Sequence, residues 1–135
     1  MKFKTLDGKE RNLKNAKKSI IDWEAKSRSK FQKEVKDFLK KYWMGDVVFE
    51  ELRIVGTRLS LDFFNANKKI AIEVQGQQHF KYVKFFHGNR INYLNQIKRD
   101  VKKDEFCQLN NIRLMEIYPT DELSSELFQK FGIDL

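Results

Sequence analysis

Three short segments in the middle of the chain restrict its fold more than any other feature. They are "VVFEELRI", "TRLSLDFFNA" and "KKIAIEVQ", and each is rich in β-branched and aromatic residues. Val55-Gly56 and Asn65-Ala66-Asn67 separate them, and both spacers are typical of turns. Three strands joined by short turns predict an antiparallel meander. A chain of 135 residues is long enough to bury a core around such a sheet as one domain.

Segments of helical period flank these strands. Residues 12–23 predict a short amphipathic helix, and a second helix is expected from about Ser29 to Trp43 because apolar residues recur every three to four positions. Residues 80–90 predict an irregular aromatic stretch, and residues 91–109 return to helical period. "IRLMEIY" predicts a fourth strand that Pro119 ends, followed by a small terminal helix within residues 121–135. The sequence therefore predicts an α+β fold in which a mixed sheet is flanked by helices and the fourth strand lies beside the third.

Several classes of protein do not match this composition. Cys107 is the single cysteine, so an internal disulfide and a cysteine-rich zinc site are excluded, and its apolar neighbours predict a buried structural thiol. No apolar run approaches the roughly 18 residues that span a bilayer, and the first residues lack the apolar segment of a signal peptide. We expect a soluble, cytoplasmic protein that does not bind membranes.

The positive charge is concentrated near the N-terminus. The whole chain has a net charge of +8, and all of the excess lies in residues 1–44. Such a block is suited to a polyanion, because neutralised phosphates release counterions; a solvated, lysine-rich surface that only improves solubility is the alternative. We expect residues 1–26 to be a basic helical extension and the nearby basic side chains to contact double-stranded DNA, namely Lys14, Lys17, Lys18, Lys26, Arg28 and Lys30.

An acidic residue lies near the end of each of two consecutive predicted strands, Asp62 on one and Glu73 on the next. If these strands pair, the two carboxylates converge, and paired carboxylates repel each other unless a cation lies between them. Oxygen ligands of this kind suit Mg²⁺. Alternatively, a nearby Lys or Arg neutralises each carboxylate. Gln75 follows Glu73 by two residues, so both side chains lie on one face of the strand.

An aspartate followed by Glu-x-Gln on the next strand resembles the core of the PD-(D/E)XK nuclease superfamily. The resemblance implies that Asp62 and Glu73 hold Mg²⁺, for which Mn²⁺ can substitute, with help from the carbonyl of Val74. It also implies that Gln75 orients the attacking water. Most members have lysine at the position of Gln75, and glutamine supplies neither positive charge nor a base.

The longer stretch "DFFNANKKIAIEVQGQQHF" resembles one branch of this superfamily, the very-short-patch repair endonucleases and the EDxHD phage homing endonucleases. The resemblance implies a general acid–base role for His79. It also places an aspartate on the later helix, which Asp100 matches, with Gln96 and Lys103 on the same helix face. The acidic residue of the first helix is matched in position by Gln32, which leaves that role unfilled or taken by another acid: Glu24, Glu34 or Glu51.

The segment "HFKYVKFFHGNRINY" interleaves aromatic and basic residues. Such mixtures stack on bases and bind phosphates, so Lys81, Lys84 and Arg90 are further candidates for DNA contact. Packing of the aromatic side chains over the sheet is the alternative.

These features together predict a Mg²⁺-dependent DNA endonuclease with its nuclease domain at residues 27–135. A free-standing homing endonuclease of phage type is the sub-class that we expect, as a homodimer that cuts both strands. A mismatch- or junction-directed nuclease remains an alternative, and so does a non-catalytic DNA-binding module on a degenerate nuclease fold.

Overall fold

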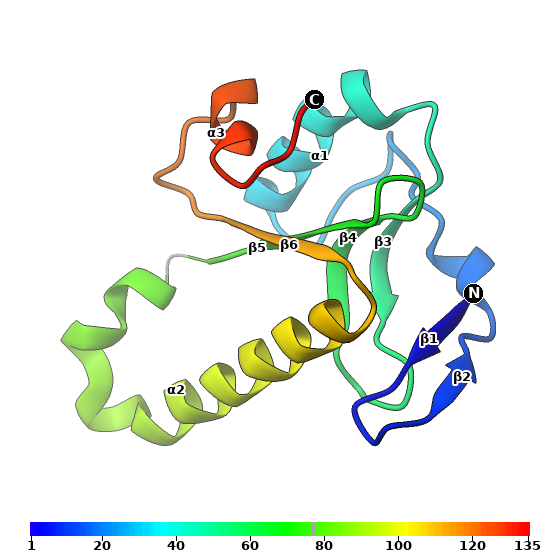
Figure 1. Cartoon of the computed structure of the whole chain (residues 1–135). Coiled ribbons are helices and arrows are strands. Elements are labelled where there is room, and N and C mark those ends of the chain that lie inside the picture. The colour runs from blue at the N-terminus through cyan, green and yellow to red at the C-terminus, as the bar shows by residue number, and fades with distance from the viewer. Residues whose placement is uncertain (77) are drawn as a thin grey trace.

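A four-stranded mixed sheet forms the centre of the protein (Figure 1). The computed structural model describes residues 1–76 and 78–135, and it describes side chains for residues 1–76 and 94–135. The first three strands are antiparallel and the fourth is parallel to the third: β3 (Val48–Arg53), β4 (Ser60–Asn65), β5 (Ile70–Val74) and β6 (Arg113–Ile117). The predicted meander, the place of the fourth strand and the α+β class with a mixed sheet are confirmed.

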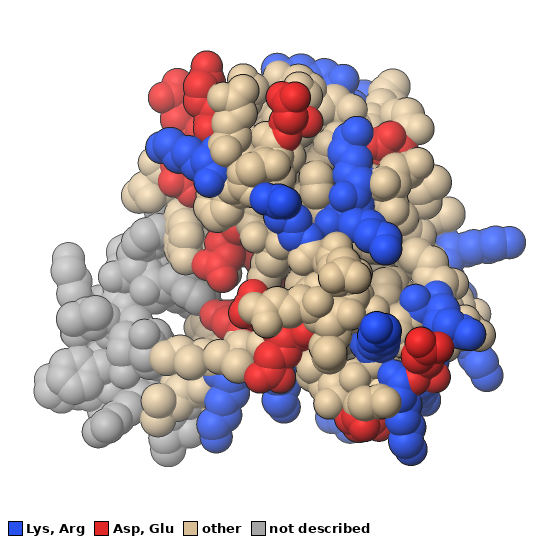
Figure 2. Space-filling model, in the orientation of Figure 1, with Lys and Arg blue, Asp and Glu red and all other residues tan. Residues whose placement is uncertain are grey.

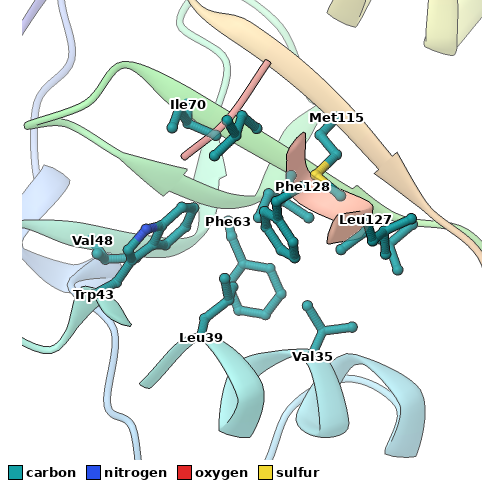
Figure 3. Packing of buried hydrophobic residues seen from close by; sticks show 12 residues of the cluster. Val35, Leu39, Trp43, Val48, Phe63, Ile70, Met115, Leu127 and Phe128 are labelled. Carbon is teal, nitrogen blue, oxygen red and sulfur yellow. The ribbon is translucent and has the colours of Figure 1, made fainter. Parts of the chain in front are cut away.

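Helices α1 (Lys30–Trp43) and α3 (Ser125–Gln129) cover one face of this sheet (Figure 1). The hydroxyl of Ser29 caps α1 by accepting a hydrogen bond from the Gln32 N–H at 3.1 Å. Leu39 and Trp43 of this helix are fully buried against Phe63 of β4 (Figure 3). The predicted helix from Ser29 to Trp43 is therefore confirmed, and its apolar face forms half of the core.

The other face is covered by the C-terminal part of α2 (Gln78–Leu109) and by a hairpin of β1 (Lys2–Lys4) and β2 (Glu10–Asn12). The ring of Phe3 lies 5.3 Å from that of Phe106 and 6.1 Å from that of Phe64, measured between centroids. Cys107 is buried beside them, as expected, and burial raises the pKa of its thiol to about 12. The N-terminal hairpin is thus part of the core on this face, and the prediction that residues 1–26 form a helical extension is wrong.

The predicted helix at residues 12–23 is wrong. The structure has a single 3₁₀ turn there, η1 (Ala16–Ser19), and Ile20 forms an isolated bridge with Phe49 of β3. Leu13 and Ala16 pack on the α2 face of the sheet, whereas Ile21 and Trp23 pack on the α1 face. The helical spacing was misleading because these side chains pack in two clusters on opposite faces of the sheet. The apolar face of one helix cannot contact both clusters.

Helix α2 also differs from the prediction, because it begins at Gln78 rather than near residue 91. The irregular stretch expected at residues 80–90 is therefore wrong. Gly88 is the one strong helix breaker in that stretch, and a glycine inside a helix costs only about 1 kcal/mol.

Over the described part of the chain, no helix is long and apolar enough to cross a membrane.

Candidate functional site

Asp62 and Glu73 lie opposite each other on neighbouring strands. Phe63 pairs with Ile72 in the β4–β5 register, which places Asp62 across from Glu73 at the next position. The Asp62 N–H donates to Oε2 of Glu73 at 2.8 Å, and the Val74 N–H donates to Oδ2 of Asp62 at 2.8 Å. The structure therefore brings together the two carboxylates and the Val74 backbone.

Burial makes it energetically unfavourable for both carboxylates of this pair to be ionised. Glu73 is 5% exposed. Burial, and then the neighbouring Asp62 carboxylate, raise the pKa of Glu73 to about 7. Burial likewise raises the pKa of Asp62, although the hydrogen bond from Val74 opposes the shift. A bound proton or a cation beside the two carboxylates relieves this cost.

The raised pKa of Glu73 predicts a dependence of stability on pH. The protonated form favours the folded state, so its contribution is fully present below the ordinary pKa of 4.5 and is lost as the pH rises through about 7. In chelator-containing buffer, the free energy of unfolding of wild type relative to Glu73→Gln should therefore fall between pH 4.5 and pH 8. Urea titrations across this range measure the difference, and a constant difference would contradict the assignment.

Lys103 of α2 forms an ion pair with Oε1 of Glu73. Its side chain is only 18% exposed. Gln96, Asp100 and Lys103 are all half-buried, in agreement with their predicted common helix face. The alternative expectation, in which a basic side chain neutralises the strand carboxylate, is thus met at Glu73. Reasoning from sequence placed Lys103 on the correct face but did not connect it with Glu73.

Gln75 follows the carboxylate pair at the end of β5. It is buried, and its N–H donates to the Ile117 carbonyl at 2.8 Å, which continues the pairing with β6. The period of two keeps Gln75 on the face of Glu73. Four other predicted residues lie in the part of α2 whose side chains are outside the described residues: His79, Lys81, Lys84 and Arg90.

Gln32 belongs to a second polar cluster, on the α1 side of the sheet. Its Nε2 donates to Oε2 of Glu50 at 3.0 Å, and the Ser27 hydroxyl donates to the same oxygen at 2.7 Å. Lys36 is fully buried and donates to Oε1 of Glu50 at 2.9 Å and to the Ala25 carbonyl at 2.9 Å. The side-chain hydrogen bond of Gln32 thus joins it to this cluster and not to Asp62.

Of the three acids proposed for the first-helix role, Glu51 is the one whose charge raises the pKa of Asp62. Glu34 is exposed, and the exposed Glu24 pairs with Lys40. Glu51 has a left-handed backbone with φ of 58°, and its carboxylate pairs with Arg28 at 2.7 Å. Asn15, Lys69 and Asn111 share this left-handed backbone, so the link between Glu51 and the carboxylate pair rests on the charge of Glu51 alone.

The β5–β6 register adds an acidic residue that the sequence alone did not reveal. Glu116 pairs with Glu73 across the two parallel strands, so both side chains lie on the α2 face. The Tyr118 hydroxyl donates to Glu116 at 2.7 Å. Burial and Glu116 raise the pKa of Tyr118 to about 12, and Asp100 contributes to the same shift. Asp100 therefore lies near Tyr118, which follows β6.

Asp62 and Glu73 offer a divalent cation two carboxylates, and the Val74 group in contact with them is its N–H, which donates to Asp62 and is not itself a metal ligand. These hard oxygen donors suit Mg²⁺ or Mn²⁺. Among the side chains that the structure describes, no group of three or more His, Cys, Asp and Glu residues is arranged to hold a metal ion. The carboxylate pair by itself supplies side-chain ligands from only two residues, and a cation bound there would take its other ligands from water or substrate.

The predicted basic side chains of the N-terminal region are exposed, as DNA contact requires: Lys14, Lys17, Lys18, Lys26, Arg28 and Lys30. Three of them line an open surface pocket together with Glu50 and Glu51: Lys18, Lys26 and Arg28. Figure 2 shows basic side chains scattered over the visible face, with acidic side chains among them. Arg28 is partly neutralised, because it pairs with Glu51.

Comparison with known proteins gives viral relatives without an assigned activity. Uncharacterized protein 307L of Invertebrate iridescent virus 6 is 33% identical over 73 residues, which is 53% of this chain and 37% of that protein. Uncharacterized protein 033L of Invertebrate iridescent virus 3 is 37% identical over 71 residues, which is 53% of this chain and 37% of the viral protein. A third relative, Uncharacterized protein 094L of Frog virus 3 (isolate Goorha), is 43% identical over 63 residues, 46% of this chain and 41% of its own.

This chain therefore spans less than half the length of the viral relatives that it matches. No protein-family model matches the chain, and no solved structure matches it.

Proposed function

We propose that this protein is a Mg²⁺-dependent DNA endonuclease with a PD-(D/E)XK core. One observation supports this more than any other: Asp62 and Glu73 face each other on adjacent strands, joined by reciprocal hydrogen bonds to each other's strand. Two buried carboxylates held in this way repel each other, and a divalent cation offsets that repulsion. The exposed lysines of the N-terminal region add a surface suited to phosphates.

The chain offers a residue for each step of phosphodiester hydrolysis. A bound Mg²⁺ would activate a water molecule and offset charge on the phosphate. Asp62, Glu73 and the Val74 carbonyl would hold the ion, and Gln75 would orient the water from the same face as Glu73. His79 would transfer the proton, and Asp100 would help to position the site from α2. Gln32 acts at a distance in this proposal, because it orients Glu50 rather than Asp62.

A free-standing homing endonuclease is the sub-class that we favour, acting as a homodimer. The viral origin of the relatives supports a viral or mobile-element setting, although their names assign no activity. A long DNA site needs contacts in two grooves, which two copies of this domain would supply.

The direct test is incubation of the protein with phage or viral genomic DNA and Mg²⁺, followed by sequencing of the ends. A homing endonuclease should give a few defined double-strand ends. Comparison of nicked, branched, mismatched and linear duplexes at equal salt separates this activity from repair or junction resolution. Absence of cleavage on every substrate, with Mg²⁺ and with Mn²⁺, would refute the nuclease proposal.

A non-catalytic DNA-binding module is the second candidate. Gln75 and Gln32 favour it, because each is an amide where the resembled nucleases have a charged residue. Isothermal titration calorimetry with Mn²⁺, in the presence and absence of DNA, distinguishes the two candidates. A module without catalytic activity should bind DNA without binding the ion.

The exposed lysines near η1 predict a salt-dependent affinity for DNA. Replacing Lys17 and Lys18 by glutamine should lower the slope of log K against log salt by about 1 for each phosphate that is no longer neutralised, without changing sequence preference. Fluorescence anisotropy at several salt concentrations measures the slope. Lys130→Gln, an exposed lysine near the C-terminus, is the matched control. Equal slopes for wild type and both variants would show that DNA binds elsewhere.

A further inference from the structure

Lys103 contacts a carboxylate that lies 30 residues earlier in the chain, on another element. Lys103 belongs to α2, yet its ammonium group contacts Oε1 of Glu73, near the end of β5 on the sheet face that α2 covers. The other Glu73 oxygen accepts the Asp62 N–H. Lys103 is thus a positive charge held in direct contact with the proposed metal-binding carboxylate, and it is largely shielded from water.

Strand β5 itself brings no positive charge to this face, because it contains no Lys or Arg. Gln75 is two residues beyond Glu73 and lies on its face, so a lysine at position 75 would extend its ammonium group toward the same carboxylate. Gln75 has no charge to contribute. Lys103 reaches this location from the helix instead of the strand.

We infer that Lys103 supplies, from α2, the positive charge that β5 lacks at Gln75. The inference rests on the proposed nuclease function. By holding Glu73 and adding charge beside it, Lys103 would stabilise the negative charge that develops on the phosphate during hydrolysis. It would also compete with a divalent cation for the Glu73 oxygens, because both are positive and Oε1 is already taken.

These two effects act in opposite directions, and their opposition provides the test. Lys103→Gln should bind Mn²⁺ several-fold more tightly by calorimetry, because the competing charge is gone. The same variant should cleave DNA roughly 100-fold more slowly in single-turnover assays, since removing one preorganised donor typically costs this much. DNA affinity, measured by anisotropy without divalent ions, should stay within about twofold because Lys103 is mostly buried. A merely structural role would weaken cleavage and ion binding together.

A relocated charge provides the second arm. The double variant Gln75→Lys/Lys103→Gln should regain at least about tenfold of the cleavage rate that Lys103→Gln loses, and its Mn²⁺ affinity should return toward wild type. Lys102→Gln, an exposed neighbour on the same helix, should match wild type in every assay. Circular dichroism and thermal melting establish that each variant is folded; if Lys103→Gln is not, Lys103→Arg, which keeps the charge, should retain cleavage.

Two results would overturn the inference: unchanged or weaker Mn²⁺ binding by folded Lys103→Gln, or no recovery in the folded double variant. If wild type cuts no DNA but Lys103→Gln still gains Mn²⁺ affinity, the charge assignment stands and the nuclease proposal fails. The Mn²⁺ affinity thus tests the role of Lys103 separately from the proposed nuclease function.

Discussion

Asp62→Asn should abolish Mg²⁺-dependent cleavage while leaving the fold intact. Asparagine keeps an oxygen that can accept the Val74 N–H, so the 2.8 Å hydrogen bond to β5 survives. What disappears is the negative charge that would bind the cation. Loss of a residue that only supports a metal ligand costs roughly 10–100-fold, so removal of the ligand itself should cost more than about 100-fold.

The variant should also be at least as stable as wild type when no metal is present. The Asp62 carboxylate raises the pKa of Glu73, so removing its charge relieves a buried repulsion. A gain of stability together with a loss of activity is characteristic of a residue retained for function. Urea unfolding with chelator, calorimetry with Mn²⁺ and single-turnover cleavage measure the three effects on one preparation.

Asp104→Asn is the control for this variant. Asp104 is an exposed acid on α2 that accepts a hydrogen bond from Gln108, so its substitution changes the net charge equally without altering the carboxylate pair. DNA binding should be the same for both variants. Cleavage by Asp62→Asn at the wild-type rate would remove Asp62 from the metal site.

The convergence of Asp62 and Glu73 could be predicted from sequence because strand pairing leaves little freedom. A short turn fixes the register of β4 and β5, and one acid lies at the matching position of each strand. The buried face of α1 was equally clear from its apolar period and its Ser29 cap. In both cases the decisive contacts lie close together in sequence.

Contacts between distant segments could not be predicted in the same way. Lys103 reaches Glu73 over 30 positions, and the Glu73–Glu116 pairing depends on where β6 joins the sheet after a 32-residue helix. A helical period shows which side chains share a face but not which carboxylate that face meets. The N-terminal hairpin was missed for a related reason, because Phe3 finds its partners at Phe64 and Phe106.

Lys36 shows the same limit and gives the largest expected effect on stability. Its position one turn after Gln32 predicts a place on the buried face of α1, yet a fully buried lysine is rare unless it is paired. Its partner, Glu50, has a side chain only 14% exposed and also binds Gln32 and Ser27. This cluster joins α1 to β3 and to the loop that holds Ala25.

Lys36→Met should therefore lower the free energy of unfolding by about 3–5 kcal/mol, because Glu50 keeps a buried charge without its cation. The double variant Lys36→Met/Glu50→Gln should recover most of this stability, since a neutral pair of similar shape leaves no charge uncompensated. Urea unfolding monitored by circular dichroism measures both values.

Lys40→Met is the matched control, one turn further along α1. Its ion pair with Glu24 lies at the surface, so the midpoint of unfolding should not change measurably. If Lys36→Met were as stable as this control, the charge of Lys36 would not be needed to hold Glu50. If the double variant were as unstable as Lys36→Met, the destabilisation would come from packing around the lysine stem rather than from the unpaired Glu50 charge.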